Sequence, residues 1–254
     1  MTHFYLDGKP YYTILGKDGK ERDTTLRDAR KVNACIGVTS IIGQLDKFQL
    51  NQWKKKRLLE VIEDKAKNKK LVFFDKWKEA ILAESEERDS IYSKRGNEVH
   101  DILEQYFTDG TIHFEDEKLL LSVIGLLHDL YGEEVIYESE KSFSHADGFG
   151  GTIDLIIHTP DGKIIIDFKT KNKSGLGSHM CTDDYMMQLA AYRKAEDTES
   201  ELEPIILCAN LLIGLEDLDE RPYFHIWSDA KLDKGEKMFY NLLEFWKLQN
   251  NYGV

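Results

Sequence analysis

The sequence lacks the features that mark membrane, secreted and iron–sulfur proteins. No apolar run approaches the roughly 20 residues that span a bilayer, and the opening residues lack the charged and apolar regions of a secretory signal. The three cysteines, Cys35, Cys181 and Cys208, are odd in number and far apart, and none lies in a C-x-x-C pair. We therefore expect a cytoplasmic protein with reduced, buried thiols and no membrane partner.

Internal repeats and low-complexity linkers are also missing from the 254 residues. That length is enough for one large domain with a sizeable core, and 41% hydrophobic and 31% charged residues are typical of a globular chain. We predict a single α/β domain over residues 1–254. Within it, residues 1–90 are expected to form an N-terminal hairpin and a helical, partly basic elaboration, and residues 91–254 the core.

Positive charge is scarce, with a net charge of −12. That total argues against a nucleic-acid partner, because phosphate binding is mainly electrostatic. The distribution is uneven, however, because Lys47 to Lys78 holds eleven Lys or Arg and four acids, an excess of seven. Within it, Lys54 and Lys55 follow Trp53. This segment is either a solvated helix face or a basic, aromatic wall that tracks a nucleic-acid strand and stacks its bases.

Two strand-like runs, residues 151–158 and 163–170, are joined by a Thr-Pro-Asp-Gly turn at 159–162. Proline at the first corner and Asp-Gly after it are typical of a tight reversal, so the runs are expected to form an antiparallel hairpin. If Thr159 pairs with Gly162 across the turn, every further pair along the two strands has residue numbers that sum to 321. That register places Asp154 directly opposite Asp167.

Alternation of side chains separates the hairpin into an apolar face and a polar face. The apolar face comprises Ile153, Leu155, Ile157, Ile164, Ile166 and Phe168. Asp154, Asp167 and Lys169 share the other face, which we expect to be solvated. Carboxylates opposed across two strands repel, and a divalent cation removes that penalty. The alternative is an ordinary hairpin with an acidic face and an Asp–Lys pair.

A helix expected over residues 90–107 carries a glycine and a histidine on one face. Gly96 in a helix interior costs about 1 kcal/mol relative to alanine, which suggests close approach by another group. His100 follows four residues later on the same face. It is either a structural histidine or, as a neutral imidazole, an extra metal ligand.

The strand expected over residues 135–143 adds acidic side chains next to the hairpin. Glu138 and Glu140 share a face of this strand. Either of them could add a third carboxylate beside Asp154.

The helix expected over residues 185–196 carries Gln188 and Tyr192 at i and i+4, hence on one face. This pair either binds a phosphate or braces the strand that carries Lys169. The alternative is a polar pair at the edge of a helix.

Five motifs together, over about residues 95–195, resemble one known family. They are R-G-x-x-V-H ending at His100, Glu140, G-x-x-D at 151–154, D-F-K-T at 167–170 and Q-x-x-x-Y at 188–192. Their order and spacing resemble the RecB-type branch of the PD-(D/E)XK nuclease superfamily. The earlier V-T-S-I-I run at 38–42, followed by Trp53, is similar to phage and mitochondrial genome-maintenance exonucleases of this branch.

The resemblance implies a mixed central β-sheet flanked by helices, and a metal site on the hairpin. His100, Asp154, Asp167 and the carbonyl of Phe168 would bind Mg²⁺ or Mn²⁺. Glu140 would lie near the metal or its water. Lys169 would position or help to deprotonate the nucleophile.

Further residues would contact DNA. Gln188 and Tyr192 would hold the backbone or the architecture of the site. Arg95, Lys171, Lys54, Lys55 and Trp53 are the remaining candidate nucleic-acid contacts. Ile153 stands where the superfamily name implies proline, a common variation, and the cysteines that hold an iron–sulfur cluster in some relatives are missing.

The resulting expectation is a metal-dependent DNA nuclease, an exonuclease on single-stranded ends that uses a metal-activated water. One alternative is an exonuclease that resects duplex ends for recombination. The other is a catalytically silent nucleic-acid-binding module. The resemblance is consistent with a phage-encoded protein in a bacterial cytoplasm, and the sequence names no protein partner.

Overall fold

The computed structural model describes residues 2–45, 48–68, 77–113, 117–172, 175–197, 203–216 and 220–253. The chain divides into two compact units. The sheet unit comprises Met1–Gln44 and Ile102–Val254, and the helical unit comprises Leu45–Asp101. Among the described helices, none combines the length and apolar character needed to cross a bilayer.

The sheet unit is built on a mixed sheet in the order β10-β9-β8-β7-β5-β1-β2, with β6 also paired to β7. These strands are β1 (Phe4–Leu6), β2 (Lys9–Pro10), β5 (Cys35–Gly37), β6 (Ile136–Ser144), β7 (Phe149–Thr159), β8 (Gly162–Lys171), β9 (Ile205–Gly214) and β10 (Tyr223–Ile226). A separate small sheet joins β3 (Thr13–Leu15) to β4 (Glu21–Asp23). The pairs β5–β7 and β8–β9 are parallel, whereas the other pairs are antiparallel.

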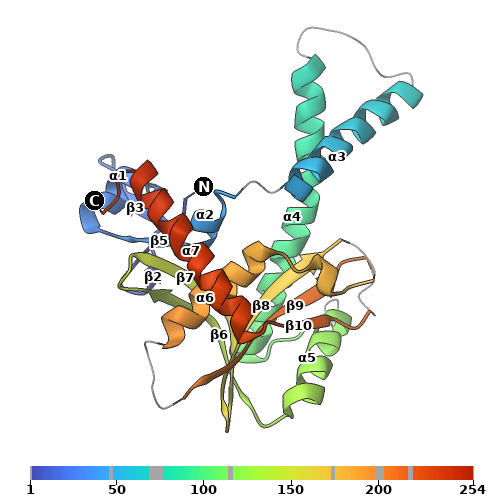
Figure 1. Ribbon diagram of the computed structural model, residues 1–254. Helices are drawn as coiled ribbons and strands as arrows, with labels where there is room; N and C mark the ends of the chain where they lie inside the picture. Colours follow the sequence, from blue (N-terminus) through green and yellow to red (C-terminus); the bar gives the residue numbers. More distant parts are fainter. Residues whose placement is uncertain are drawn as a thin grey trace. The chain divides into compact units, whose positions relative to one another are not determined.

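The helices of this unit cover both faces of the sheet (Figure 1). They are α1 (Leu26–Val32), α2 (Val38–Ile42), α5 (Glu117–Tyr131), α6 (Asp183–Asp197), α7 (Asp229–Gln249) and the last turns of α4 (Trp77–Asp109). A short 3-10 helix, η2 (Ser178–Met180), precedes α6. The predicted α/β fold with a mixed central sheet flanked by helices is confirmed.

The predicted hairpin register is confirmed up to the Leu155–Ile166 pair, and the expected Asp154–Asp167 pair lies beyond the paired residues. Thr159 pairs with Gly162, and Leu155 pairs with Ile166. The turn needs its glycine, because Gly162 has φ +140° and a Cβ atom there would lie 2.2 Å from the carbonyl oxygen of Pro204. Turn chemistry therefore determines which residues of the two strands face each other.

The expectation of a solvated polar face on the hairpin is wrong for Asp167, whereas Asp154 and Lys169 are half-buried. Asp167 is 0% exposed, because α6 lies along this face of β8. Glu196 of α6 accepts a hydrogen bond from Lys163 of β8 at 3.1 Å. The same strands place Ile156 and Ile165 among the polar residues, both 0% exposed. Near-continuous apolar runs are typical of strands buried on both faces, so this signal was present in the sequence.

Aromatic contacts join the helices to the sheet. Phe239 of α7 meets Phe149 of β7 edge to face, with centroids 5.1 Å apart. Phe107 of α4 stacks on Phe168 of β8 at 6.2 Å. Phe168 alternates with Asp167 along β8, so the end of α4 and helix α6 pack on opposite faces of this strand.

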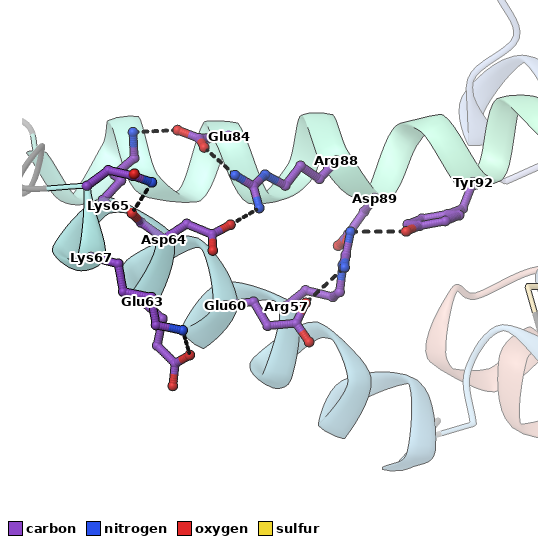
Figure 2. A network of polar contacts seen from close by, with 11 residues as sticks. Arg57, Glu60, Glu63, Asp64, Lys65, Lys67, Glu84, Arg88, Asp89 and Tyr92 are labelled. Atoms are coloured by element: carbon purple, nitrogen blue, oxygen red, sulfur yellow. Dashed lines mark hydrogen bonds and ion pairs between the residues drawn. The ribbon is translucent and has the colours of Figure 1, made fainter.

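The helical unit consists of α3 (Phe48–Lys67) and the larger part of α4. Charged and polar contacts join the two helices (Figure 2): Lys65–Glu84 at 2.6 Å, Asp64–Arg88 at 2.9 Å and Arg57–Tyr92 at 3.3 Å. Residue numbers rise along α3 as those of the partners fall along α4, so the helices run antiparallel. Val61 and Ile81, 0% and 5% exposed, contribute buried apolar surface.

Candidate active site

The candidate site lies where the paired register of β7 and β8 ends. Asp154 directly precedes Leu155, the last residue of β7 that is paired with β8 on this side. Its Oδ2 accepts a hydrogen bond from the backbone N–H of Phe168 at 2.7 Å. Burial raises the pKa of the Asp154 carboxyl well above its usual range, and the nearby carboxylate of Asp167 raises it further. Negative charge at Asp154 is therefore destabilised in the folded protein, and a proton or a cation would relieve it.

Asp167 is fully buried and is held by two neighbours. The ammonium of Lys169 lies 2.8 Å from its Oδ1 and 2.7 Å from its Oδ2. The side-chain amide of Asn210 donates to Oδ2 at 2.7 Å. Burial lowers the pKa of Lys169, but the carboxylates of Asp167 and Asp154 outweigh burial, so the net shift is upward. Lys169 is therefore a cation at neutral pH.

Glu140 supplies a third carboxylate. Ser139 pairs with Leu155 and Lys141 pairs with Ile153, so Glu140 lies level with Asp154 on the neighbouring strand. Its charge also raises the pKa of Asp154. The backbone of Glu140 is left-handed, with φ +52°, a conformation that costs a non-glycine residue about 1–2 kcal/mol. Strained residues of this kind concentrate at functional sites.

Glu138, the other acid that the sequence left open, is placed differently. It pairs with Ile156 in the strand register. Its carboxylate lies 3.2 Å from Nε2 of His158 and 3.9 Å from the ammonium of Lys141. Of the two acids, Glu140 is the one that acts electrostatically on Asp154.

Gln188 and Tyr192 of α6 are buried near the carboxylates of Asp154 and Asp167. They are 8% and 2% exposed, and the Gln188 amide donates to the Tyr192 hydroxyl at 2.8 Å. Burial raises the pKa of Tyr192 well above its usual range, and the charges of Asp167 and Asp154 add to the shift. This placement favours a bracing role over direct contact with a phosphate.

Tyr185 is a residue that the sequence reasoning missed. Its hydroxyl accepts a hydrogen bond from the ammonium of Lys171 at 2.7 Å. Its ring centroid lies 4.6 Å from that ammonium and 5.2 Å from the ammonium of Lys169. Tyr185 precedes Gln188 by three residues and so shares its helix face, which is the signal that sequence analysis could have used.

Hydroxyl groups of two N-terminal tyrosines form a second feature that was missed. The Tyr5 hydroxyl lies 2.7 Å from that of Tyr12 and 3.3 Å from Oγ1 of Thr152. Thr152 is in turn 2.8 Å from the hydroxyl of Ser142. Burial raises the pKa of Tyr12, with smaller contributions from Tyr5 and Glu140. Residues that the sequence analysis grouped with the N-terminal elaboration therefore extend this polar region.

The remaining predicted residues lie in the helical unit. His100 is half-buried on α4, and Arg95 of the same helix pairs with Glu98 at 3.2 Å. Lys54 and Lys55 are exposed on α3. The side chain of Trp53, Lys47 and residues 69–76 lie outside the described residues. Their roles as metal ligand or nucleic-acid contacts stay predictions.

The excess of positive charge in the helical unit is smaller than the excess of seven counted over Lys47 to Lys78. Over residues 45–101 there are fourteen Lys or Arg and twelve Asp or Glu, because α4 brings acids to α3. Arg57 pairs with Glu60 at 2.9 Å, and Lys65 pairs with Glu84 at 2.6 Å (Figure 2). Part of the basic run is thereby neutralised within the unit, so less of it is left for phosphates.

The donor set around Asp154 suits a hard divalent cation. Over the residues that the structure describes, no three His, Cys, Asp or Glu side chains are already gathered as a metal site. The carboxylates of Glu140, Asp154 and Asp167 with the ammonium of Lys169 nevertheless sum to two negative charges when all are ionised. Oxygen donors and excess negative charge fit Mg²⁺ or Mn²⁺. The cation would have to compete with Lys169 for Asp167.

Comparison with known proteins adds no family. No family model matches the sequence, and no curated protein matches it. Among solved structures, the chain is similar to the crystal structure of SSO0001, with a TM-score of 0.31 and 14% identity over 82% of this chain and 75% of that chain. A TM-score this low carries no argument about function.

Proposed function

We propose that the chain is a metal-dependent deoxyribonuclease of the RecB-type branch of the PD-(D/E)XK superfamily. The observation that carries the proposal is the state of Asp154. Asp154 is half-buried beside Asp167 and Glu140, and the pKa of its carboxyl is raised well above the usual range. A fold tolerates such a cluster of acids most readily where a cation is bound in the working state.

The residues present fit Mg²⁺ or Mn²⁺, because they offer carboxylate oxygens with unbalanced negative charge. Asp154 and Asp167 would hold the ion, with Glu140 beside it. The resemblance adds His100 and the carbonyl of Phe168. The ion would polarise a phosphoryl oxygen and make the attacking water more acidic.

The chain's own residues supply the other parts of the reaction. The charged ammonium of Lys169 stabilises negative charge that develops on the phosphate in the transition state. Lys169 also positions the nucleophile or helps to deprotonate it. A carboxylate oxygen of Glu140 accepts the proton of the attacking water. Gln188 and Tyr192 brace β8, which carries Asp167 and Lys169.

The proposed substrate is DNA, which the enzyme degrades from single-stranded ends. This specificity follows from the resemblance to genome-maintenance exonucleases. Lys171 at the end of β8 is a candidate backbone contact, as are Lys54 and Lys55 of α3. A duplex-end exonuclease and a silent binding module are the competing functions.

A nuclease assay on the full chain separates these functions. The purified protein is incubated with end-labelled linear and closed circular DNA, single- and double-stranded, in Mg²⁺, Mn²⁺ or EDTA. We expect loss of linear single strands in Mg²⁺ or Mn²⁺, intact circles, and no reaction in EDTA. Asp167→Ala should be inactive, whereas Asp129→Ala, at an exposed pair with Arg221, should match the wild type.

Each contrary result removes one part of the proposal. Cleavage of circles contradicts exonuclease action, and preferential loss of linear duplex favours end resection. Activity in EDTA, or in Asp167→Ala, overturns the metal mechanism. Binding without cleavage under every condition leaves the silent module.

A further inference from the structure

A chain of hydrogen bonds connects the edge of the sheet to the candidate metal ligand Asp167. The indole N–H of Trp227 donates to Oδ1 of Asn210 at 2.7 Å. The amide Nδ2 of Asn210 donates to Oδ2 of Asp167, also at 2.7 Å. Asn210 and Asp167 are both 0% exposed, so water cannot replace either partner.

Strand pairing places the members of this chain side by side. Asp167 of β8 pairs with Asn210 of β9, and Asn210 pairs with His225 of β10. Trp227 follows β10, where its backbone N–H donates to the carbonyl of Cys208 at 3.1 Å. Its ring meets that of His225 edge to face at 4.5 Å. The indole is therefore fixed by backbone and ring contacts.

The chemistry of the three groups allows one arrangement. An indole N–H only donates, and an ionised carboxylate only accepts. The amide between them must accept with its oxygen from Trp227 and donate with its nitrogen to Asp167. If the amide turned over, two donors would meet at Trp227 and two acceptors at Asp167, and both hydrogen bonds of Asn210 would be lost. Trp227 thus sets the orientation of Asn210.

We propose that Asn210, oriented by Trp227, is a positioning residue that holds the Asp167 carboxylate in the geometry that binds the divalent cation. This inference rests on the proposed function and goes beyond it, because neither residue belongs to the motifs that suggested the activity. Asn210 occupies one side of Oδ2 and restricts rotation of the carboxylate. Outer partners of metal ligands typically contribute about 10- to 100-fold to metal affinity.

The test is a titration of the full chain with Mn²⁺, followed by the electron paramagnetic resonance signal of the free ion. We expect the dissociation constant to rise about 10- to 100-fold in Asn210→Ala. Trp227→Phe, which keeps an aromatic ring and removes the fused five-membered ring with its N–H, should weaken Mn²⁺ binding in the same direction. Trp246→Phe is the matched control, because Trp246 lies on α7 with its ring against Tyr252, and its Mn²⁺ affinity should equal that of the wild type.

A double-mutant cycle tests whether Trp227 acts through Asn210. In the Asn210→Ala background, Trp227→Phe should cause no further loss of Mn²⁺ affinity. A second readout is kinetic: the apparent KM for Mn²⁺ should rise in Trp227→Phe, while kcat at saturating Mn²⁺ stays at the wild-type value. A purely structural role would lower the melting temperature without this split.

The outcomes distinguish this inference from the function on which it rests. Wild-type affinity in both single variants overturns the positioning role and leaves the nuclease proposal standing, as does additivity in the cycle. No Mn²⁺ binding by the wild type overturns the proposed function and this inference together. If Asn210→Ala does not fold, Trp227→Phe alone decides, and unchanged Mn²⁺ affinity there overturns the inference.

Discussion

The backbone N–H of Phe168 donates to Oδ2 of Asp154 across the two hairpin strands, at 2.7 Å. This bond holds the Asp154 carboxyl at the level where Glu140 and Asp167 also act on it. An asparagine at position 154 has a carbonyl oxygen that can accept the same bond. Replacement of Asp154 by asparagine therefore removes the charge and keeps the geometry, which separates the electrostatic role of this residue from its structural one.

Asp154→Asn should abolish turnover and increase stability. The pKa of Asp154 is raised in the folded protein. At pH values between the usual aspartate pKa and this raised pKa, the folded protein therefore binds more protons than the unfolded chain. Stability contributed by the protonated form is therefore present near pH 3.8, the usual aspartate value, and is lost as pH rises through the raised pKa. The amide does not ionise, so the variant escapes this loss.

Thermal unfolding in EDTA as a function of pH checks this prediction. The melting temperatures of wild type and Asp154→Asn should be similar at pH 4 and diverge as pH rises. The variant should gain about 0.5–2 kcal/mol, the usual range for one stabilising change. Added Mn²⁺ should raise the melting temperature of the wild type only. A constant offset between the two proteins across the pH range would contradict the assigned cause.

Ile166→Asp should prevent folding of the sheet unit. Ile166 is 0% exposed in the centre of β8, and a buried, unpaired carboxylate costs several kcal/mol, against a total stability of roughly 5–15 kcal/mol. Ile136→Asp is the matched control, because Ile136 of the neighbouring β6 is 72% exposed and its change should stay within about 0.5 kcal/mol. Circular dichroism of the two variants decides, and native-like spectra for Ile166→Asp would be incompatible with the described core.

Tyr185 should affect DNA binding through its hydroxyl group and turnover through its ring. Tyr185→Phe removes the acceptor of Lys171 and keeps the ring under Lys169, so KM for DNA should rise while kcat is retained. Tyr185→Leu also removes the ring, a contact of about 0.5–2 kcal/mol, so kcat should fall roughly 2- to 30-fold. Steady-state kinetics on a labelled strand measures both. Equal kcat in the Phe and Leu variants would show that the ring does not position Lys169.

Glu196→Ala should destabilise the sheet unit strongly. Glu196 is 1% exposed and holds Lys163, which is 4% exposed, at 3.1 Å. Removal of one partner of a buried pair leaves an uncompensated charge and costs about 3–5 kcal/mol. Asp129→Ala breaks the exposed pair with Arg221 and should cost less than about 1 kcal/mol. Urea unfolding of both variants gives the comparison, and equal midpoints would refute the assigned burial of the pair.

Local sequence patterns predicted the elements around the site closely. The Thr-Pro-Asp-Gly turn determines the hairpin register, because a two-residue reversal admits few pairings, and the structure confirms Leu155 opposite Ile166. The helix expected over residues 185–196 also lies close to where the sequence places it, as α6 (Asp183–Asp197). The motif residues Asp154, Asp167 and Lys169 were found for the same reason, since their spacing lies within one hairpin.

The polar face of the hairpin shows where local patterns were insufficient. Alternation separates the two faces of a strand, but it does not say whether a helix will cover the polar one. The carboxylate of Asp167 is buried because α6 packs along β8, and the left-handed backbone of Glu140 lies level with Asp154, where β6 runs beside β7. Neither result follows from the residues adjacent in the chain.

The sequence by itself thus determined the hairpin, the helix that became α6 and the choice of Asp154, Asp167 and Lys169, because turn chemistry and side-chain period act over a few neighbouring residues. Only the tertiary structure brought Asn210 to Asp167. These residues are 43 positions apart, and they meet because β8 and β9 pair in parallel after the crossover through α6. The order of strands in the sheet, set by the burial of whole faces and not by any local motif, decided which polar groups surround the site.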